Sequence, residues 1–261
     1  MDPNKYYGKY RGFVVDNEDP EKRGRLRLRV PSALAGEVTA WALPCAPFGG
    51  SNDQGFFMMP VVGAQVWAEF EEGNLDYPIW SGTFWQSSGE APVENPQKAS
   101  TTRLLRTPSG HSLQFDDEAG AESFLLTHPS GTEIRIDEKG TIEIKGANGE
   151  QLTLDAAANI SLSDSNNNEL SMNSSGVTVK DASGNQIEMA GSGITIKGSA
   201  VTIDAGMVSL GGSGGEPLMK GTSLLSWLAS HTHNCTAPGT PSGPPVPPPT
   251  PALLTTKTTA N

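Results

Sequence analysis

Residues 133–173 read EIRIDEKGTIEIKGANGEQLTLDAAANISLSDSNNNELSMN, and this stretch decides the fold. A short unit recurs in it: two apolar residues separated by one polar residue, then a polar turn that often holds Gly, Asn or Asp. Side chains two apart on an extended strand point the same way, so each unit predicts a short strand with two inward side chains. The pairs are Ile134/Ile136, Ile142/Ile144, Leu152/Leu154, Ile160/Leu162, Leu170/Met172, Val177/Val179, Ile187/Met189, Ile194/Ile196, Val201/Ile203 and Val208/Leu210.

So narrow an apolar stripe cannot enclose a core within one chain, and the strands therefore need neighbours. A single-chain parallel β-helix needs roughly 20 residues per coil, whereas these pairs start only 7 to 10 residues apart. This spacing favours an intertwined three-chain β-helix, a prism that takes one short strand at a time from each chain. Less regular strands are expected earlier, around Leu104/Leu105, Leu113/Phe115 and Phe124/Leu126. The sequence thus predicts a shaft over residues 102–216, about 60 Å long at ~4.8 Å per strand.

A search of the shaft for catalytic groups finds one dense acidic run, Asp116 to Glu118, with His111 and His128 near it. A groove that cleaves glycans needs paired carboxylates beside aromatic platforms, and the shaft has no Trp or Tyr. We therefore expect no catalytic residue and no enzyme. Aspartates at strand ends are expected to bond the backbone of their turns; these are Asp137, Asp155, Asp164, Asp181 and Asp204.

Residues 1–87 alternate apolar and polar side chains in five or six short runs broken by Gly, Pro, Asn and Asp, which predicts a small closed barrel. In the run 25–30, Leu26, Leu28 and Val30 are expected to face inward and the three arginines outward. The surface that these three arginines form is a solvated strand face, a docking surface for an acidic partner, or a nucleic-acid site. Trp67, Phe70 and Trp80 are expected in the barrel core.

Composition narrows the class of protein. The net charge of −11 is concentrated in residues 88–216, which hold 18 acidic and 8 basic side chains. Such a surface repels phosphates, so no nucleic acid is expected as a partner. The two cysteines, Cys45 and Cys235, give no disulfide framework and no metal knuckle. The start of the chain lacks the layout of a secretion signal, so we expect assembly in the cytoplasm.

Two segments flank the shaft. Residues 88–101 are rich in Ser, Pro and Gly and predict a linker. In the tip region, 217–261, Leu224, Leu225 and Leu228 predict a short helix capped by Thr222 or Ser223.

His231-Thr232-His233 follows this helix. On an extended strand both imidazoles point one way, and three copies around an axis would bring six nitrogens together; otherwise the histidines are simply solvated. Eight prolines lie between residues 238 and 251, which predicts a Pro-rich C-terminal tail that is largely polyproline II or disordered in isolation.

The order of GRLRLRVP (24–31), WALPCAP (41–47) and GFFMMPVVGAQVWAEFEEGNLDYPIWSGTFWQ (55–86) resembles the OB-fold domain of phage baseplate assembly protein V and of the central spike proteins of contractile tails and type VI secretion. The resemblance covers residues 8–86. It implies a homotrimeric spike, seated under a baseplate hub protein in a virion or an extracellular injection particle, that sheath contraction drives through a target cell envelope. It also implies that His231 and His233 bind an iron ion on the three-fold axis, with zinc or nickel as the second choice.

Two other functions fit parts of the sequence. A β-helical tail fibre that binds a receptor or acts on carbohydrate would share the shaft, and an OB-fold nucleic-acid binder would share the barrel. The Pro-rich tail is expected to wrap the tip or to dock a separate tip or cargo protein.

Overall fold

The computed structural model describes residues 5–205 and 221–231. The chain divides into two compact units, 1–199 and 200–261, and each is described by itself. The predicted all-β class is confirmed: the described residues hold sixteen strands and two α-helices, α1 (Pro31–Leu34) and α2 (Gly221–Ser230). Neither helix is long and apolar enough to cross a membrane. The division into segments 1–87, 88–101, 102–216 and 217–261 stays a prediction.

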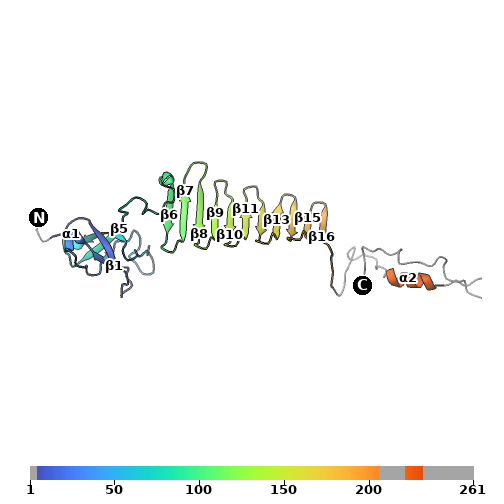
Figure 1. Cartoon of the computed structure of the whole chain (residues 1–261), viewed down its shortest axis with the longest axis horizontal. Coiled ribbons are helices and arrows are strands. Elements are labelled where there is room, and N and C mark those ends of the chain that lie inside the picture. Colours follow the sequence, from blue (N-terminus) through green and yellow to red (C-terminus); the bar gives the residue numbers. More distant parts are fainter. Residues whose placement is uncertain (1–4, 206–220, 232–261) are drawn as a thin grey trace, which may run out of the picture. The chain divides into compact units, whose positions relative to one another are not determined.

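The N-terminal strands form a five-stranded sheet in the order β2-β1-β4-β5-β3. Two 3-10 turns, Glu71–Gly73 and Pro96–Lys98, follow β4 and β5. The edges of the sheet meet where Leu26 and Ala42, beside β2 and β3, exchange backbone hydrogen bonds of 3.1 and 2.7 Å. The sheet is therefore closed as the predicted barrel, seen in Figure 1. The bounds are β1 (Tyr10–Asp16), β2 (Arg27–Arg29), β3 (Leu43–Pro44), β4 (Gln65–Phe70) and β5 (Pro78–Thr83).

The barrel core follows the alternation of the strands. Leu26, Leu28 and Val30 are fully buried, as predicted. Trp80 packs against this core and donates its indole N–H to the Gly24 carbonyl at 3.0 Å. The prediction for Trp67 is wrong. Its strand neighbours on either side point inward, so its own ring lies on the outer surface.

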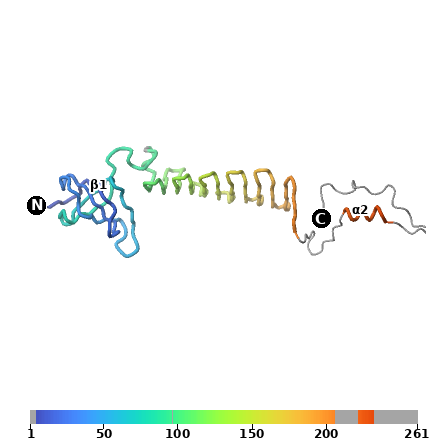
Figure 2. The backbone as a smooth tube through the Cα atoms, turned by 60° about the horizontal axis from the view of Figure 1, so that its bottom comes forward, coloured from blue at the N-terminus to red at the C-terminus, as the bar shows by residue number. Residues whose placement is uncertain are grey.

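The shaft is one sheet of eleven strands in which every strand pairs antiparallel with the next one in the sequence. Figure 2 shows the resulting zigzag of the chain. The predicted path is corrected here: one chain supplies consecutive strands, because turns of two to six residues return it at once to its own edge. The strands are β6 (Thr102–Arg106), β7 (Ser112–Asp116), β8 (Ser123–Thr127), β9 (Glu133–Ile136), β10 (Ile142–Lys145), β11 (Gln151–Leu154), β12 (Ile160–Ser163), β13 (Glu169–Asn173), β14 (Gly176–Lys180), β15 (Gln186–Ala190) and β16 (Gly193–Lys197).

The limits of the sheet differ from the predicted ones. β6 to β8 are as regular as the later strands, with five paired residues each. Val201 and Ile203 lie beyond β16 in residues without secondary structure, and Asp204 is therefore not at a strand end. The last predicted pair, Val208/Leu210, lies outside the described residues.

Aspartate side chains hold the turns as predicted. The carboxylate of Asp164 accepts the backbone N–H groups of Asn166 and Asn168 at 2.8 and 2.9 Å and the Asn168 amide at 2.7 Å. Asn167, the fourth residue of the turn, has a left-handed φ of 66°, which Asn tolerates well. The same pattern repeats at Asp137, Asp155 and Asp181.

These bonds make the shaft sensitive to acid. Hydrogen bonds from Asn168 lower the pKa of Asp164 from 3.8 to about 2, and similar bonds lower the pKa values of the other three turn aspartates. A lowered folded-state pKa stabilises the fold above the unfolded value, and the contribution is lost as pH falls from 3.8 toward 2. We expect the melting temperature to fall over this window.

The double variant Asp164→Asn, Asp181→Asn tests this, because Asn keeps the size and one oxygen acceptor but does not titrate. Its melting temperature, followed by circular dichroism, should fall less between about pH 5 and pH 2 than that of the wild type. Asp204→Asn, outside the turns, is the control and should keep the wild-type slope. Equal slopes in the wild type and the double variant would contradict the role of these turns.

Gly176 is the position where β14 requires glycine. Its φ is 144°, and a Cβ there would lie 1.9 Å from the carbonyl oxygen of Met189 on β15. Gly176→Ala should destabilise the shaft by at least about 1–3 kcal/mol and should remove hydrogen-exchange protection from β14 and β15. At Gly191 a Cβ would meet nothing within 4 Å, so Gly191→Ala is the matched control. Unchanged protection in Gly176→Ala would refute the close approach.

Candidate functional site

The shaft carries two unbroken rows of apolar side chains, here called the apolar columns. Each apolar residue lies directly opposite an apolar residue of the next strand. The second column runs from β6 to β16 on one face, and the first runs from β7 to β16, because Arg103 of β6 lies opposite Phe115. The first column is Phe115, Phe124, Ile136, Ile142, Leu154, Ile160, Met172, Val177, Met189 and Ile194. The second is Leu105, Leu113, Leu126, Ile134, Ile144, Leu152, Leu162, Leu170, Val179, Ile187 and Ile196.

Much of this apolar surface is accessible to solvent. Leu162 is 48% exposed and Ile144 37%, and Ile194, in the last strand, reaches 70%. An exposed apolar surface of this length marks an association site in a soluble protein. The columns are therefore the main candidate site of the chain.

From β10 to β16 the opposite face of the sheet is polar, whereas in the earlier strands Leu104 of β6 and Leu125 of β8 also lie on it. Between the apolar residues, the facing positions on successive strands are Glu143, Thr153, Ser161, Ser171, Thr178, Glu188 and Thr195. One face of the sheet is thus suited to water and the other to burial, the usual division in an antiparallel sheet. The register is strongly specified, because a slip of one residue would turn every apolar side chain to the wrong face.

His231 closes helix α2, the only described element of the second unit. Its backbone N–H donates to the Trp227 carbonyl at 2.8 Å, and its ring stacks on the Trp227 indole with centroids 4.7 Å apart. The ring Nδ1 lies 2.9 Å from the Leu228 carbonyl, which can only accept, so Nδ1 carries the proton. In the neutral ring the lone pair is then on Nε2, the arrangement typical of metal-binding histidines.

The second predicted ligand, His233, lies outside the described residues. Within 5–205 and 221–231, no three His, Cys, Asp or Glu side chains come close enough to hold a metal ion. One chain thus presents His231 at the end of α2, and the metal site at His231 and His233 stays a prediction. The predicted cap is corrected: α2 begins at Gly221, so Thr222 and Ser223 lie in its first turn.

The acidic run of the shaft is occupied by structural contacts. Asp116 accepts hydrogen bonds of 2.8 Å from Thr102 and from Gln114, and these lower its pKa. Glu118 pairs with Lys98 and Asp117 lies 3.7 Å from Arg103. A general acid needs the opposite, a carboxyl whose pKa is raised.

The two shaft histidines sit on turns. The rings of His111 and His128 lie 4.7 Å apart, edge to face. The backbone N–H of Ser130 donates to Nδ1 of His128 at 3.1 Å, so this nitrogen stabilises the turn.

The arginines of the barrel divide into two kinds. Arg25 is a structural residue: its side chain is 11% exposed and pairs with Asp19 at 2.6 Å, which holds the pKa of Asp19 well below its usual range. Arg27 and Arg29 point outward, as predicted, and are exposed. Of the three arginines that were predicted to form a docking surface, Arg27 and Arg29 on β2 therefore remain as candidates.

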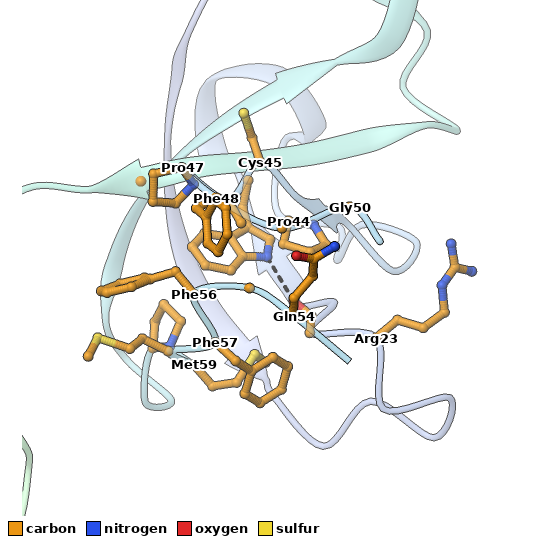
Figure 3. A pocket seen from close by; sticks show the side chains of 18 of the residues that line it. Arg23, Pro44, Cys45, Pro47, Phe48, Gly50, Gln54, Phe56, Phe57 and Met59 are labelled. Atoms are coloured by element: carbon orange, nitrogen blue, oxygen red, sulfur yellow. Dashed lines mark hydrogen bonds between the residues drawn. The ribbon is translucent and has the colours of Figure 1, made fainter. Parts of the chain in front are cut away.

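A pocket on the barrel was not predicted from the sequence. It has a volume of about 870 Å³ and lies under the loop that joins β3 to β4, as Figure 3 shows. Phe48, Phe56 and Phe57 of this loop line it and are 50 to 70% exposed. The sequence pattern that could have predicted the pocket is GFFMM (55–59), a run of apolar residues that the small barrel core cannot hold.

Comparison with known proteins shows which family the barrel resembles. Residues 10–85 match the family described as the type VI secretion system/phage-baseplate injector OB domain. The type VI secretion system spike protein VgrG3 of Vibrio cholerae is 28% identical over 140 residues, which are 51% of this chain and 14% of VgrG3. The spike protein VgrG4b of Pseudomonas aeruginosa is 27% identical over 115 residues, 41% of this chain and 14% of that protein.

The actin cross-linking toxin VgrG1 of Vibrio cholerae is 28% identical over 114 residues, 41% of this chain and 10% of the toxin. The matches therefore span at most about a seventh of these relatives. Among solved structures, the TCP domain of SAS-4 from Drosophila melanogaster is similar over 41% of this chain and 88% of its own, with 14% identity, but its TM-score of 0.25 carries no argument. The predicted resemblance to baseplate and type VI spike proteins is confirmed.

Proposed function

We propose that this chain, whose barrel matches the injector OB domain, is the homotrimeric central spike of a contractile injection system or phage tail. The observation that carries the proposal is the pair of exposed apolar columns on a sheet with only one polar face. Three copies that turn their columns toward a common axis form a prism with a dry interior and a polar outside. Each aliphatic side chain that is fully buried in this way contributes roughly 1.5–3 kcal/mol.

A prism of this kind can transmit force along its length. Each chain keeps its own hydrogen-bond ladder, and the columns hold the three ladders together along the length of the shaft. Close-packed interiors are stiff, so force applied at the barrel end is transmitted along the shaft. We infer that the barrels seat the spike under a baseplate hub and that sheath contraction drives the shaft through a target cell envelope.

The proposed spike is one component of a larger particle. The spike belongs to a virion or an extracellular injection particle, and the Pro-rich segment after His233 docks a separate tip or cargo protein. No residue of the chain is assigned a catalytic role. The acidic run of the shaft supports this assignment, because its carboxylates pair with Lys98 and Arg103.

The metal site completes the spike. His231 and His233 of three chains supply six imidazole nitrogens around the axis, a set that suits octahedral iron or nickel better than tetrahedral zinc. Iron is the first choice. The hydrogen bond from Nδ1–H of His231 to the Leu228 carbonyl supports this site, because it sets the tautomer that metal-binding histidines commonly have.

A charge in the columns tests the trimer. Leu162→Lys places an ammonium group in the proposed dry interior, at a penalty of about 3 kcal/mol or more per chain. We expect sedimentation at micromolar concentration to show loss of the trimer. Ser161→Lys, on the adjacent polar face, is the matched control and should sediment like the wild type. Identical behaviour of both variants would remove the columns from the interface.

Metal analysis tests the histidine site. The purified wild-type protein should hold one iron ion per three chains, and the double variant His231→Ala, His233→Ala should hold none. The control is His111→Ala, His128→Ala, which changes the same number of histidines on the shaft turns and should keep the metal. Equal metal content in all three proteins would exclude the site.

A further inference from the structure

Three arginines lie together on the outer face of the barrel, here called the arginine face. Arg27 and Arg29 come from β2 and Arg11 from the neighbouring β1, and all three are exposed. Arg29 lies directly opposite Phe13 of β1, two residues along the strand from Arg11. Alternation along each strand places these side chains on the same side of the sheet.

Aromatic rings support two of the arginines. The guanidinium of Arg29 lies over the ring of Phe13 at 5.6 Å, and that of Arg11 lies over Phe84 at 5.5 Å. Trp67 backs Phe84, with ring centroids 4.7 Å apart. Stacking of this kind fixes a guanidinium and leaves its N–H edge available for a planar anion. The face is therefore ordered before any ligand binds.

Three of the barrel's basic side chains that form no ion pair among the described residues lie on this face. Residues 1–87 contain 11 acidic and 8 basic side chains, so carboxylates are in excess. Lys9, Arg23 and Arg25 form ion pairs. Within the described part of the chain, Arg11, Arg27 and Arg29 form none, although Arg27 donates to the Thr39 carbonyl at 3.4 Å. Arg11 and Arg29, which stack on aromatic rings and form no ion pair with a described residue, lie with the exposed Arg27 on one face of an acidic domain and suit an external anionic ligand.

We propose that the arginine face docks a carboxylate-rich segment of the protein on which the barrel is seated, an inference that rests on the proposed function. Guanidinium forks bind carboxylates in pairs of parallel hydrogen bonds. Nucleic acid fits less well. Bases bind OB barrels by stacking on aromatic rings, and here guanidinium groups already lie over Phe13 and Phe84.

The test measures fluorescence anisotropy of a fluorescein-labelled deca-glutamate peptide with the full chain at low salt. The variant Arg11→Glu, Arg29→Glu should bind the peptide at least about tenfold more weakly than the wild type. Lys22→Glu, Arg23→Glu makes the same change of charge on the exposed loop before β2 and should bind within about twofold of the wild type. Unlabelled deca-thymidylate should not displace the peptide.

Three outcomes would overturn the proposal: no binding by the wild type, equal loss in both double variants, or tighter binding of deca-thymidylate than of the peptide. The mass of each protein, measured in parallel, separates this test from that of the trimer. A monomeric wild type that binds the peptide through Arg11 and Arg29 would refute the trimer and support the arginine face.

Discussion

A strand with only two apolar side chains on one face cannot be buried by its own chain, and the organisation of the shaft depends on this constraint. Ten such strands, β7 to β16, lie in register and produce a sheet that is apolar on one face and, from β10 on, polar on the other. The apolar face is too narrow to fold over on itself and too long to remain in water without cost. Association of several sheets through the apolar columns satisfies the constraint, and the proposed three-fold arrangement is one that closes around an axis.

The turns align the apolar residues of neighbouring strands. Each aspartate turn returns the chain so that apolar residues of consecutive strands meet, as Leu152 meets Leu162 and Leu154 meets Ile160. The Asp side chain bonds the backbone of its turn, and the fourth residue takes the left-handed conformation. The columns therefore follow from local chemistry repeated along the chain.

Sequence reasoning succeeded where the neighbouring residues in the sequence decide whether a side chain is buried or what it bonds. The burial of Leu26, Leu28 and Val30, the aspartate turns and the helix before His231 all follow from local pattern. It failed where the partner of a strand or ring is decided by the whole fold. The two-residue stripe requires neighbours but does not say whether they come from the same chain, and Trp67 lies outside because Val66 and Ala68 take the interior. The stacked arginines were not foreseen either, because Phe84 reaches Arg11 only once the barrel is closed.

The barrel and the shaft divide the work of the proposed spike: an arginine face for seating, apolar columns for rigidity and a histidine pair for the tip. The apolar columns and the histidine pair depend on copies of the chain standing side by side around one axis. The most direct measurement is the mass of the wild-type protein in solution, by multi-angle light scattering at micromolar concentration. The account predicts three times the 27.4 kDa of one chain. A mass of 27.4 kDa, with the apolar columns left in water, would contradict it.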